Sequence, residues 1–278
     1  MKWETWFMTD NARLFVTLEG YAVEGGFDQV GEPATCYSPT IALGRHAGPG
    51  GADDLWHHYE NVLDFVPGLG FDGVRLSLEW TRIEPRADEV DTVALSRYLE
   101  VVRHARSLGL DVTVVVIDGV WPAWLGQEAW LLPWVAPYVL AHSRRVVEHF
   151  GDDITGVLAF AQPQELVTNG YLSASAPPWR RSALIDASFA HAQIGRIMEE
   201  LREDDVVGAK LVTSSTVVTL DSAPEDLLAA RDAFVGSEIY VRSLLRGAGP
   251  TSVSAGLLVR SGDQWRVSAS DELLSALR

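Results

Sequence analysis

Cysteine is nearly absent: Cys36 is the one cysteine in 278 residues. A single cysteine cannot form a disulfide within the chain, so nothing in the sequence calls for an oxidising compartment. The first six residues, Met-Lys-Trp-Glu-Thr-Trp, lack the apolar core of a signal peptide. We therefore expect a cytoplasmic protein. Its richness in alanine, valine, arginine and aspartate is typical of high-GC bacteria such as actinobacteria.

Positive charge is also scarce, with 22 lysines and arginines against 38 aspartates and glutamates and a formal net charge of -16. Binding to nucleic acid or to an anionic membrane needs a basic surface, so these partners are excluded. No apolar run approaches the roughly 20 residues that a membrane helix requires. The expected partner is a small-molecule substrate or ligand.

Signatures of cofactors and metals are missing as well. No spacing of His, Cys or Asp resembles a metal site, and Gly48-Pro-Gly-Gly-Ala52 lacks the strand-to-helix context of a phosphate loop. Ser214 and Ser215 lack the Gly-x-Ser-x-Gly pattern of a hydrolase elbow. We expect neither a cofactor nor a metal.

What the sequence does contain is an alternation of strand-like and helical patterns. A hydrophobic content of 47% over 278 residues suits one domain, 1–278, with a single core. Strand followed by helix at regular intervals predicts a parallel sheet with right-handed crossovers. Predicted strands cover 14–18, 74–78, 110–117, 156–160 and 207–212, and predicted helices cover 53–65 (capped by Asp53 and Asp54), 92–106, 137–150, 183–202 and 222–246.

Two segments depart from this alternation. The stretch 25–51 is crowded with Gly and Pro, and it is predicted to be a functional loop over the mouth of the fold. The last part, 247–278, predicts a β-hairpin around 261–263 and a short helix. Since an open parallel sheet leaves unpaired edges, we expect this hairpin, or a second copy of the chain in a homodimer, to cover them.

Five segments carry a resemblance to a known family: Tyr21-Ala-Val-Glu-Gly25, Asp54-Leu-Trp-His-His-Tyr59, Leu69 to Ile83, Val120-Trp-Pro-Ala-Trp-Leu125 and Val157-Leu-Ala-Phe-Ala-Gln-Pro-Gln-Glu165. In this order they resemble the N-terminal part of glycoside hydrolase family 1, the β-glucosidase clan of (β/α)8 barrels. The resemblance runs from about Leu14 to about Arg246. It implies an α/β, TIM-barrel-like fold that is truncated, with family-like βα units in 1–246 and an incomplete or atypical closure at the C-terminal end.

The active site implied by the resemblance is degenerate. The family carries its acid/base glutamate in an Asn-Glu-Pro triplet, where this chain reads Ala161-Gln162-Pro163. A carboxamide cannot donate a proton to a leaving group, whereas a retaining glycosidase needs two carboxyls about 5 Å apart. The family nucleophile lies in a Glu-Asn-Gly triplet, and the sequence contains none.

At positions where the family binds the sugar, this chain has different residues. Ala22 stands where the family has Gln, and Asp118-Gly119 stand where it has His-Trp. Residues that resemble the family scaffold persist, namely Glu24, Arg75, Trp80, Arg82, Pro122 and Trp124. Loss confined to the site predicts a change of function.

Reactive groups in such barrels lie at the carboxyl ends of the strands. This rule predicts Asp118 and Glu165 as acid/base residues, together with Gln162. Predicted substrate-binding residues are Glu24, Arg75, Glu79, Trp80, Trp121, Trp124 and Tyr171. Two ambiguities stay open: Arg75 either pairs with Glu24 or Glu79 or binds an anion, and Glu165 either faces the cavity or caps the next helix.

Three functions fit this pattern. The first is a repurposed enzyme that applies acid/base chemistry (elimination, isomerisation or cyclisation) to a cyclic or polyhydroxylated small molecule, in natural-product biosynthesis for example. The second is a non-catalytic ligand-binding protein. The third is a residual β-glycosidase that borrows a carboxylate such as Glu165 or Asp118. The sequence favours them in that order.

Overall fold

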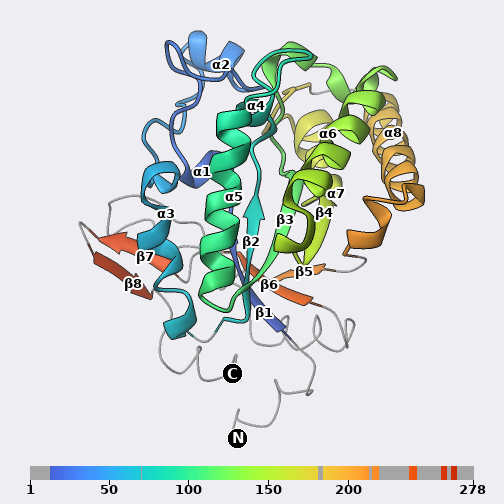
Figure 1. The fold of residues 1–278 in the computed structure, drawn as a ribbon. Coiled ribbons are helices and arrows are strands. Elements are labelled where there is room, and N and C mark those ends of the chain that lie inside the picture. Colours follow the sequence, from blue (N-terminus) through green and yellow to red (C-terminus); the bar gives the residue numbers. More distant parts are fainter. Residues whose placement is uncertain are drawn as a thin grey trace, which may run out of the picture.

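The computed structural model describes residues 13–69, 71–180, 184–212, 215–218, 238–242, 258–261 and 264–267. Its centre is a six-stranded parallel sheet with the order β4-β3-β2-β1-β6-β5 (Figure 1). The strands are β1 (Arg13–Leu18), β2 (Gly73–Ser77), β3 (Asp111–Ile117), β4 (Gly156–Phe160), β5 (Ser215–Val218) and β6 (Glu238–Arg242). The predicted α/β architecture is confirmed.

The strands β2, β3 and β4 are buried at almost every position, and apart from Arg75 and Ser77 in β2 and Asp111 and Thr113 in β3 their residues are apolar or glycine. Such runs belong to parallel strands that are covered on both faces. Val74 of β2 pairs with Val16 on one side and with Val112 on the other, so equivalent apolar residues lie side by side across the sheet.

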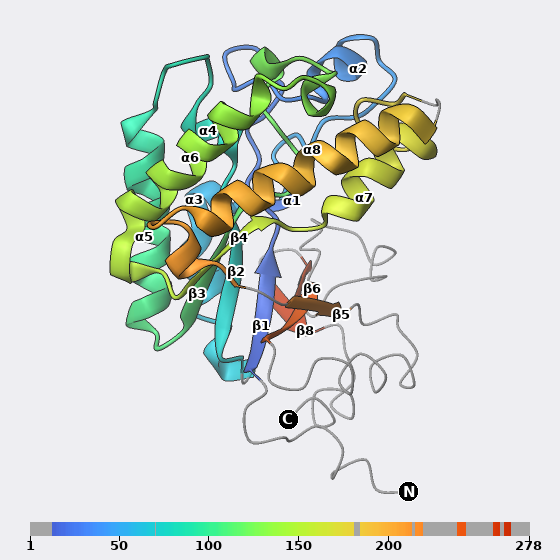
Figure 2. The same cartoon turned by 90° about the vertical axis from the view of Figure 1, so that its right-hand side faces the viewer.

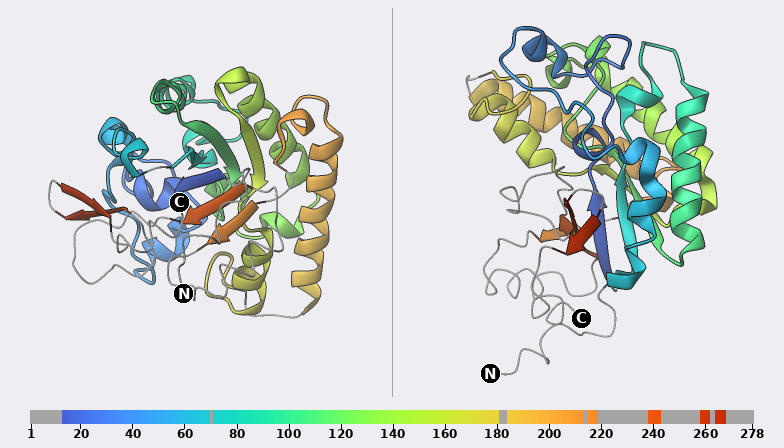
Figure 3. Two further views of the ribbon diagram at one scale, coloured as in Figure 1. Left: turned by 90° about the horizontal axis from the view of Figure 1, so that it is seen from below. Right: turned by 90° about the vertical axis from the view of Figure 1, so that its left-hand side faces the viewer.

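Helices flank this sheet (Figure 2), and the strands form a curved wall with the long helices on its outer side (Figure 3). The helices are α1 (Gly20–Val23), α2 (Ser38–Ala42), α3 (Leu55–Leu63), α4 (Trp80–Ile83), α5 (Thr92–Ser107), α6 (Val135–Phe150), α7 (Pro163–Val167) and α8 (Leu184–Glu203). Shorter turns of helix cover Pro67–Leu69, Ala123–Leu125, Ala129–Leu131, Gly151–Asp153, Thr168–Leu172 and Gly208–Lys210. Within the described residues, none of the helices is both long and apolar enough to cross a membrane.

Helix α5 shows how local sequence fixes these elements. The Asp91 side chain accepts hydrogen bonds from the amides of Val93 and Ala94, which would otherwise lack partners at the helix start. Gly109 follows the helix with φ 81°, a left-handed conformation that glycine adopts at little cost.

The predicted cap of α3 is wrong. Asp54 has a left-handed backbone and makes no side-chain cap. Its carboxylate instead contacts His57 at 2.5 Å and His58 at 3.3 Å. Residues three and four positions further along a helix lie on the same side as Asp54, so both rings can reach its carboxylate.

The predicted strand 207–212 is also wrong in its extent. Asp204 accepts hydrogen bonds from the amides of Val206 and Val207, and this local turn competes with strand pairing. Within 207–212, only Leu211 forms a bridge to β4, at Val157.

In the C-terminal part, one predicted helix is partly wrong and one predicted hairpin is present. Residues 238–242 lie inside the predicted helix 222–246, yet they form β6, because their sequence Glu-Ile-Tyr-Val-Arg is rich in strand-forming side chains. The rest of that predicted helix falls outside the described residues. β7 (Leu258–Ser261) and β8 (Gln264–Val267) form an antiparallel hairpin, where the sequence predicts one. This hairpin is a separate two-stranded sheet. The short helix predicted after it lies outside the described residues, and the single domain and the homodimer stay predictions.

Candidate functional site

A cavity of about 660 Å³ opens at the carboxyl ends of β1, β3 and β4, a size that suits a small-molecule ligand. Its wall comes from the turn after β1, the segments on either side of α2, the residues after β2 and β3, and α7 with the turn that follows it. The predicted mouth loop 25–51 therefore contributes to the cavity, through Tyr37 and residues 46–49.

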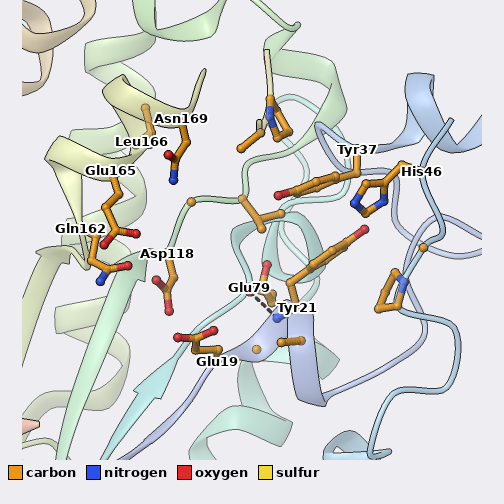
Figure 4. A pocket seen from close by; sticks show the side chains of 18 of the residues that line it. Glu19, Tyr21, Tyr37, His46, Glu79, Asp118, Gln162, Glu165, Leu166 and Asn169 are labelled. Carbon is orange, nitrogen blue, oxygen red and sulfur yellow. Dashed lines mark hydrogen bonds between the residues drawn. The ribbon is translucent and has the colours of Figure 1, made fainter. Parts of the chain in front are cut away.

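Polar and aromatic side chains occupy different sides of this cavity (Figure 4). Gln162, Glu165 and Asn169 lie on one side. Tyr37 and His46 lie on the opposite side, and their rings are 4.9 Å apart. The three carboxyls of Glu19, Glu79 and Asp118 lie between the two sides.

Glu79 is the most deeply buried acid that lines the cavity, at 3% exposure. It lies between β2 and α4, and its Oε1 accepts a 2.7 Å hydrogen bond from the Tyr21 amide. Burial raises the pKa of Glu79 well above its ordinary value, and the negative charges of Glu24 and Asp118 raise this pKa further. The raised pKa extends the pH range over which Glu79 is protonated, which a general acid requires.

Asp118 follows β3 directly and is held in place from β2. The Ser77 hydroxyl donates to its Oδ2, and Nη2 of Arg75 lies 3.8 Å from its Oδ1. Arg75 is thus within ion-pair distance of Asp118, and it is not among the residues that line the cavity.

Gln162 and Glu165 approach the cavity from the start of α7. Gln162 is partly buried just ahead of the helix, and Glu165 is exposed in its first turn. Both line the cavity. The structure thus brings together the three predicted catalytic side chains, Asp118, Gln162 and Glu165, and adds the predicted substrate-binding residue Glu79.

Glu24 was predicted to bind substrate, but it lies behind the cavity wall. Its Oε2 accepts a 3.0 Å hydrogen bond from Nε of Arg82, and its Oε1 accepts one of 2.7 Å from the Tyr98 hydroxyl. All three side chains are buried. Glu24 and Arg75 are therefore placed as supports for the cavity floor rather than as parts of its surface.

The four aromatic residues that were predicted to bind substrate do not line the cavity. Trp80 stacks on His142 with ring centres 4.9 Å apart, and Trp124 packs edge-on against Trp80. Trp121 and Tyr171 are fully buried. None of these four rings lines the cavity, because large rings fill the space between helices and sheet.

Sequence reasoning missed Glu19, Tyr21, Tyr37, His46 and Asn169. Glu19 could have been found, because it directly follows β1 and obeys the strand-end rule. Tyr21 and Tyr37 stack with ring centres 5.1 Å apart, and this contact joins α1 to the mouth loop. No local pattern in the sequence signals it.

Hydrogen bonds to Asp28 hold the mouth loop 25–51 together and join it to α1. Asp28 accepts hydrogen bonds from the hydroxyls of Tyr21, Thr35 and Ser38.

Within the described part of the chain, no group of three or more His, Cys, Asp or Glu side chains could hold a metal ion.

The family model "Glycosyl hydrolase family 1" matches residues 15–274. Among curated proteins, the chain is 28% identical to Beta-glucosidase 47 of Arabidopsis thaliana over 189 residues, covering 64% of this chain and 35% of that protein. It is 21% identical to a 6-phospho-beta-galactosidase of Clostridium acetobutylicum over 240 residues, covering 83% of this chain and 50% of that protein.

Solved structures give the same fold. A beta-glycosidase from Pyrococcus horikoshii superposes with a TM-score of 0.65 at 20% identity, covering 82% of this chain and 53% of that one. Aphid myrosinase superposes with a TM-score of 0.67 at 16% identity, with 82% and 53% covered. The chain spans about half the length of these two structures, and half or less of the two curated relatives. On the strength of the match over residues 15–274, the chain belongs to glycosyl hydrolase family 1.

Proposed function

We propose that this chain uses the family 1 fold for acid/base chemistry on a cyclic or polyhydroxylated small molecule, with Glu79 as proton donor and Asp118 as proton acceptor. The observation that carries the proposal is the raised pKa of Glu79, which lines the cavity while almost fully buried. A pair of neighbouring carboxyls, of which one is held protonated, is a common arrangement for proton transfer.

The reaction follows from the two roles. The Glu79 O–H donates its proton to an oxygen of the substrate, and the Asp118 carboxylate accepts a proton from a carbon or a hydroxyl of the same molecule. The substrate gains one proton and loses one, so the net change is an isomerisation, a ring closure, or an elimination that releases water. Such steps are typical of specialised metabolism.

Double displacement on a glycoside is disfavoured by Gln162. It lines the cavity where the resemblance implies the acid/base glutamate, and its carboxamide cannot protonate a leaving group.

The first experiment tests hydrolysis directly. We expect no release of nitrophenol from nitrophenyl glycosides, either by the unaltered protein or by Gln162→Glu. Release by the unaltered protein would favour a residual glycosidase that borrows Asp118 or Glu165, and it would overturn the proposal.

The second experiment looks for turnover. The protein is incubated with fractionated cyclic and polyhydroxylated metabolites, and mass spectrometry follows compounds that change. Glu79→Gln and Asp118→Asn are each expected to slow the conversion by about 10²-fold or more, as for loss of a general acid or base. Glu148→Gln, on the exposed face of α6, is the matched control and should convert at the original rate.

A ligand-binding protein without turnover is the second candidate. It is favoured by the contacts of Asp118, since Ser77 and Arg75 already engage both of its carboxylate oxygens. Under this alternative, metabolites bind to the protein but none changes in the turnover experiment.

A further inference from the structure

The charge of the cavity points to the chemistry of its ligand. Four carboxyl side chains line it, and its described lining contains neither lysine nor arginine. These carboxyls come from four separate elements: Glu19 after β1, Glu79 after β2, Asp118 after β3 and Glu165 in α7. A cavity lined by one sign of charge concentrates ligands of the opposite sign.

Buried arginines behind the cavity offset this charge only in part. Arg75 faces Asp118, and Arg82 is engaged by Glu24 and by the carbonyl of Gly25. Neither guanidinium lines the cavity, so neither can receive an anionic ligand there.

Glu79 supplies an independent observation. Its carboxyl is 3% exposed and lines the cavity, and Oε1 accepts the hydrogen bond from the Tyr21 amide. Among the described residues, Oε2 has no hydrogen-bond partner. At the cavity wall, Oε2 is therefore open to a hydrogen bond with water or with a ligand.

We propose that the ligand of this cavity is a polyol with a protonated amine, such as an amino sugar or an aminocyclitol, whose ammonium group lies against Glu79 and Asp118. The inference rests on the proposed function, because it names the substrate class of the same site. The Asp118 carboxylate would accept a charge-assisted hydrogen bond from the ammonium, while Oε2 of Glu79 faces an oxygen of the ligand. The amides of Gln162 and Asn169 across the cavity suit the hydroxyls of a polyol.

An organic cation fits better than a metal ion. No three acidic, histidine or cysteine side chains within the described residues are grouped closely enough to bind a metal. Opposite Glu165, the stacked rings of Tyr21 and Tyr37 offer carbon surface for the apolar face of a ring-shaped ligand.

The test compares ligands that differ only in the amine. Isothermal titration calorimetry measures glucosamine against glucose, galactosamine against galactose, and an aminocyclitol against inositol. In at least one pair, the amine should bind at least about tenfold more tightly at neutral pH. Raising the salt concentration should reduce that preference, because salt screens an ionic contact.

Variants locate the contact. Asp118→Asn should remove most of the preference for the amine at neutral pH, and Glu79→Gln should remove the part that grows as Glu79 ionises. Glu165→Gln should weaken the preference less, because solvent screens its exposed carboxylate. Glu148→Gln removes one negative charge outside the cavity and should retain the full preference.

Three outcomes would overturn the inference: equal affinity within every pair, no binding by any member, or binding of Ca²⁺ or Mg²⁺ that displaces the amine. Failure of the proposed function looks different. If amines bind with the expected preference but no amino polyol is converted, the ligand class stands and catalysis is wrong. If a neutral polyol is converted and amines show no advantage, catalysis stands and the ligand class is wrong.

Discussion

Nε of Arg82 donates a 3.0 Å hydrogen bond to Oε2 of Glu24, and both side chains are buried beneath the cavity floor. The guanidinium also lies over the rings of Phe27 and Trp56, at 4.3 and 4.1 Å. Arg82→Met leaves a buried carboxylate without its counter-charge, so we expect a loss of about 3–5 kcal/mol in the free energy of unfolding. Urea denaturation measures it.

The control for that experiment is Arg86→Met. Arg86 pairs with Glu89 on the exposed surface, where solvent screens the ion pair. We expect Arg86→Met to have the same urea midpoint of unfolding as the unaltered protein. Equal losses for the two variants would contradict a structural role of the buried pair.

His142 makes stability depend on pH. Burial lowers the pKa of its imidazole, although the hydrogen bond with Glu84 opposes this. A histidine whose pKa is lower in the folded state stabilises the protein above its unfolded pKa of roughly 6.5, and that contribution is lost as the pH falls. His142→Asn should therefore reduce the loss of stability between about pH 7.5 and pH 5.5.

The matched control is His191→Asn, on the exposed surface of α8. Urea denaturation at the two pH values should give the same pH dependence for this variant as for the unaltered protein. A slope unchanged by His142→Asn would mean that other groups cause the acid sensitivity.

Gly20 gives a test of the cavity floor by steric means. A Cβ atom there would lie 2.6 Å from Cγ of Glu79 and 3.0 Å from Oε1 of Glu24. Gly20→Ala should cost about 1–3 kcal/mol of stability through overpacking, and it should weaken ligand binding because it displaces Glu79. Thermal unfolding and calorimetry measure the two effects.

The same substitution at Gly195 should act in the opposite direction. Gly195 lies inside α8, and a Cβ there would meet no atom within 4 Å. Gly195→Ala should stabilise the chain by up to about 1 kcal/mol through helix propensity, without an effect on binding. If Gly20→Ala behaves like Gly195→Ala, the close contact with Glu79 is wrong.

Affinity for an amine should rise with pH. The pKa of Glu79 is raised by burial and then by Glu24 and Asp118, so at lower pH the neutral acid attracts a cation weakly. Raising the pH toward that pKa adds the negative charge, and the bound cation favours it further. Calorimetry between about pH 5.5 and pH 8, with an amine that stays protonated over this range and in buffers with different ionisation enthalpies, should show tighter binding and proton release.

Several charged and titratable groups surround Glu79 in that experiment. They are Tyr21 from α1, Glu24 directly after α1, Cys36 and Tyr37 from the mouth loop, Arg75 from β2, Asp118 directly after β3, Arg82 from α4, and Tyr98 from α5. Glu79→Gln should flatten the dependence on pH. A profile that keeps its slope in this variant would assign the proton to a different group.

The elements that could be predicted from sequence are those with local causes. The apolar run before Asp118 and the helical spacing after Asp91 indicated β3 and α5, because each signal lies within a few residues of the element. The strand β6 was missed, since its register depends on Phe15 and its neighbours more than 200 residues earlier in the chain.

The same division holds for the site. Asp118, Gln162 and Glu165 could be located because the strand-end rule needs only the position of the preceding strand. Trp80 and Trp124 were misplaced, because sequence does not show whether a ring after a strand turns toward the cavity or toward a helix such as α6. The Tyr37 amide donates to Oγ1 of Thr35, whose own amide donates to Asp28, and no spacing rule describes this arrangement.

The position of β1 between β2 and β6 bears on how the chain acquires its shape. Synthesis delivers β1 first, yet one of its two neighbours emerges only with residues 238–242. During that interval, one backbone edge of β1 can pair with any other exposed strand, including that of another nascent chain. Bringing such distant segments together carries a large entropic cost and slows folding. The yield of correctly folded protein should therefore depend on chaperones that shield this edge until β6 has been synthesised.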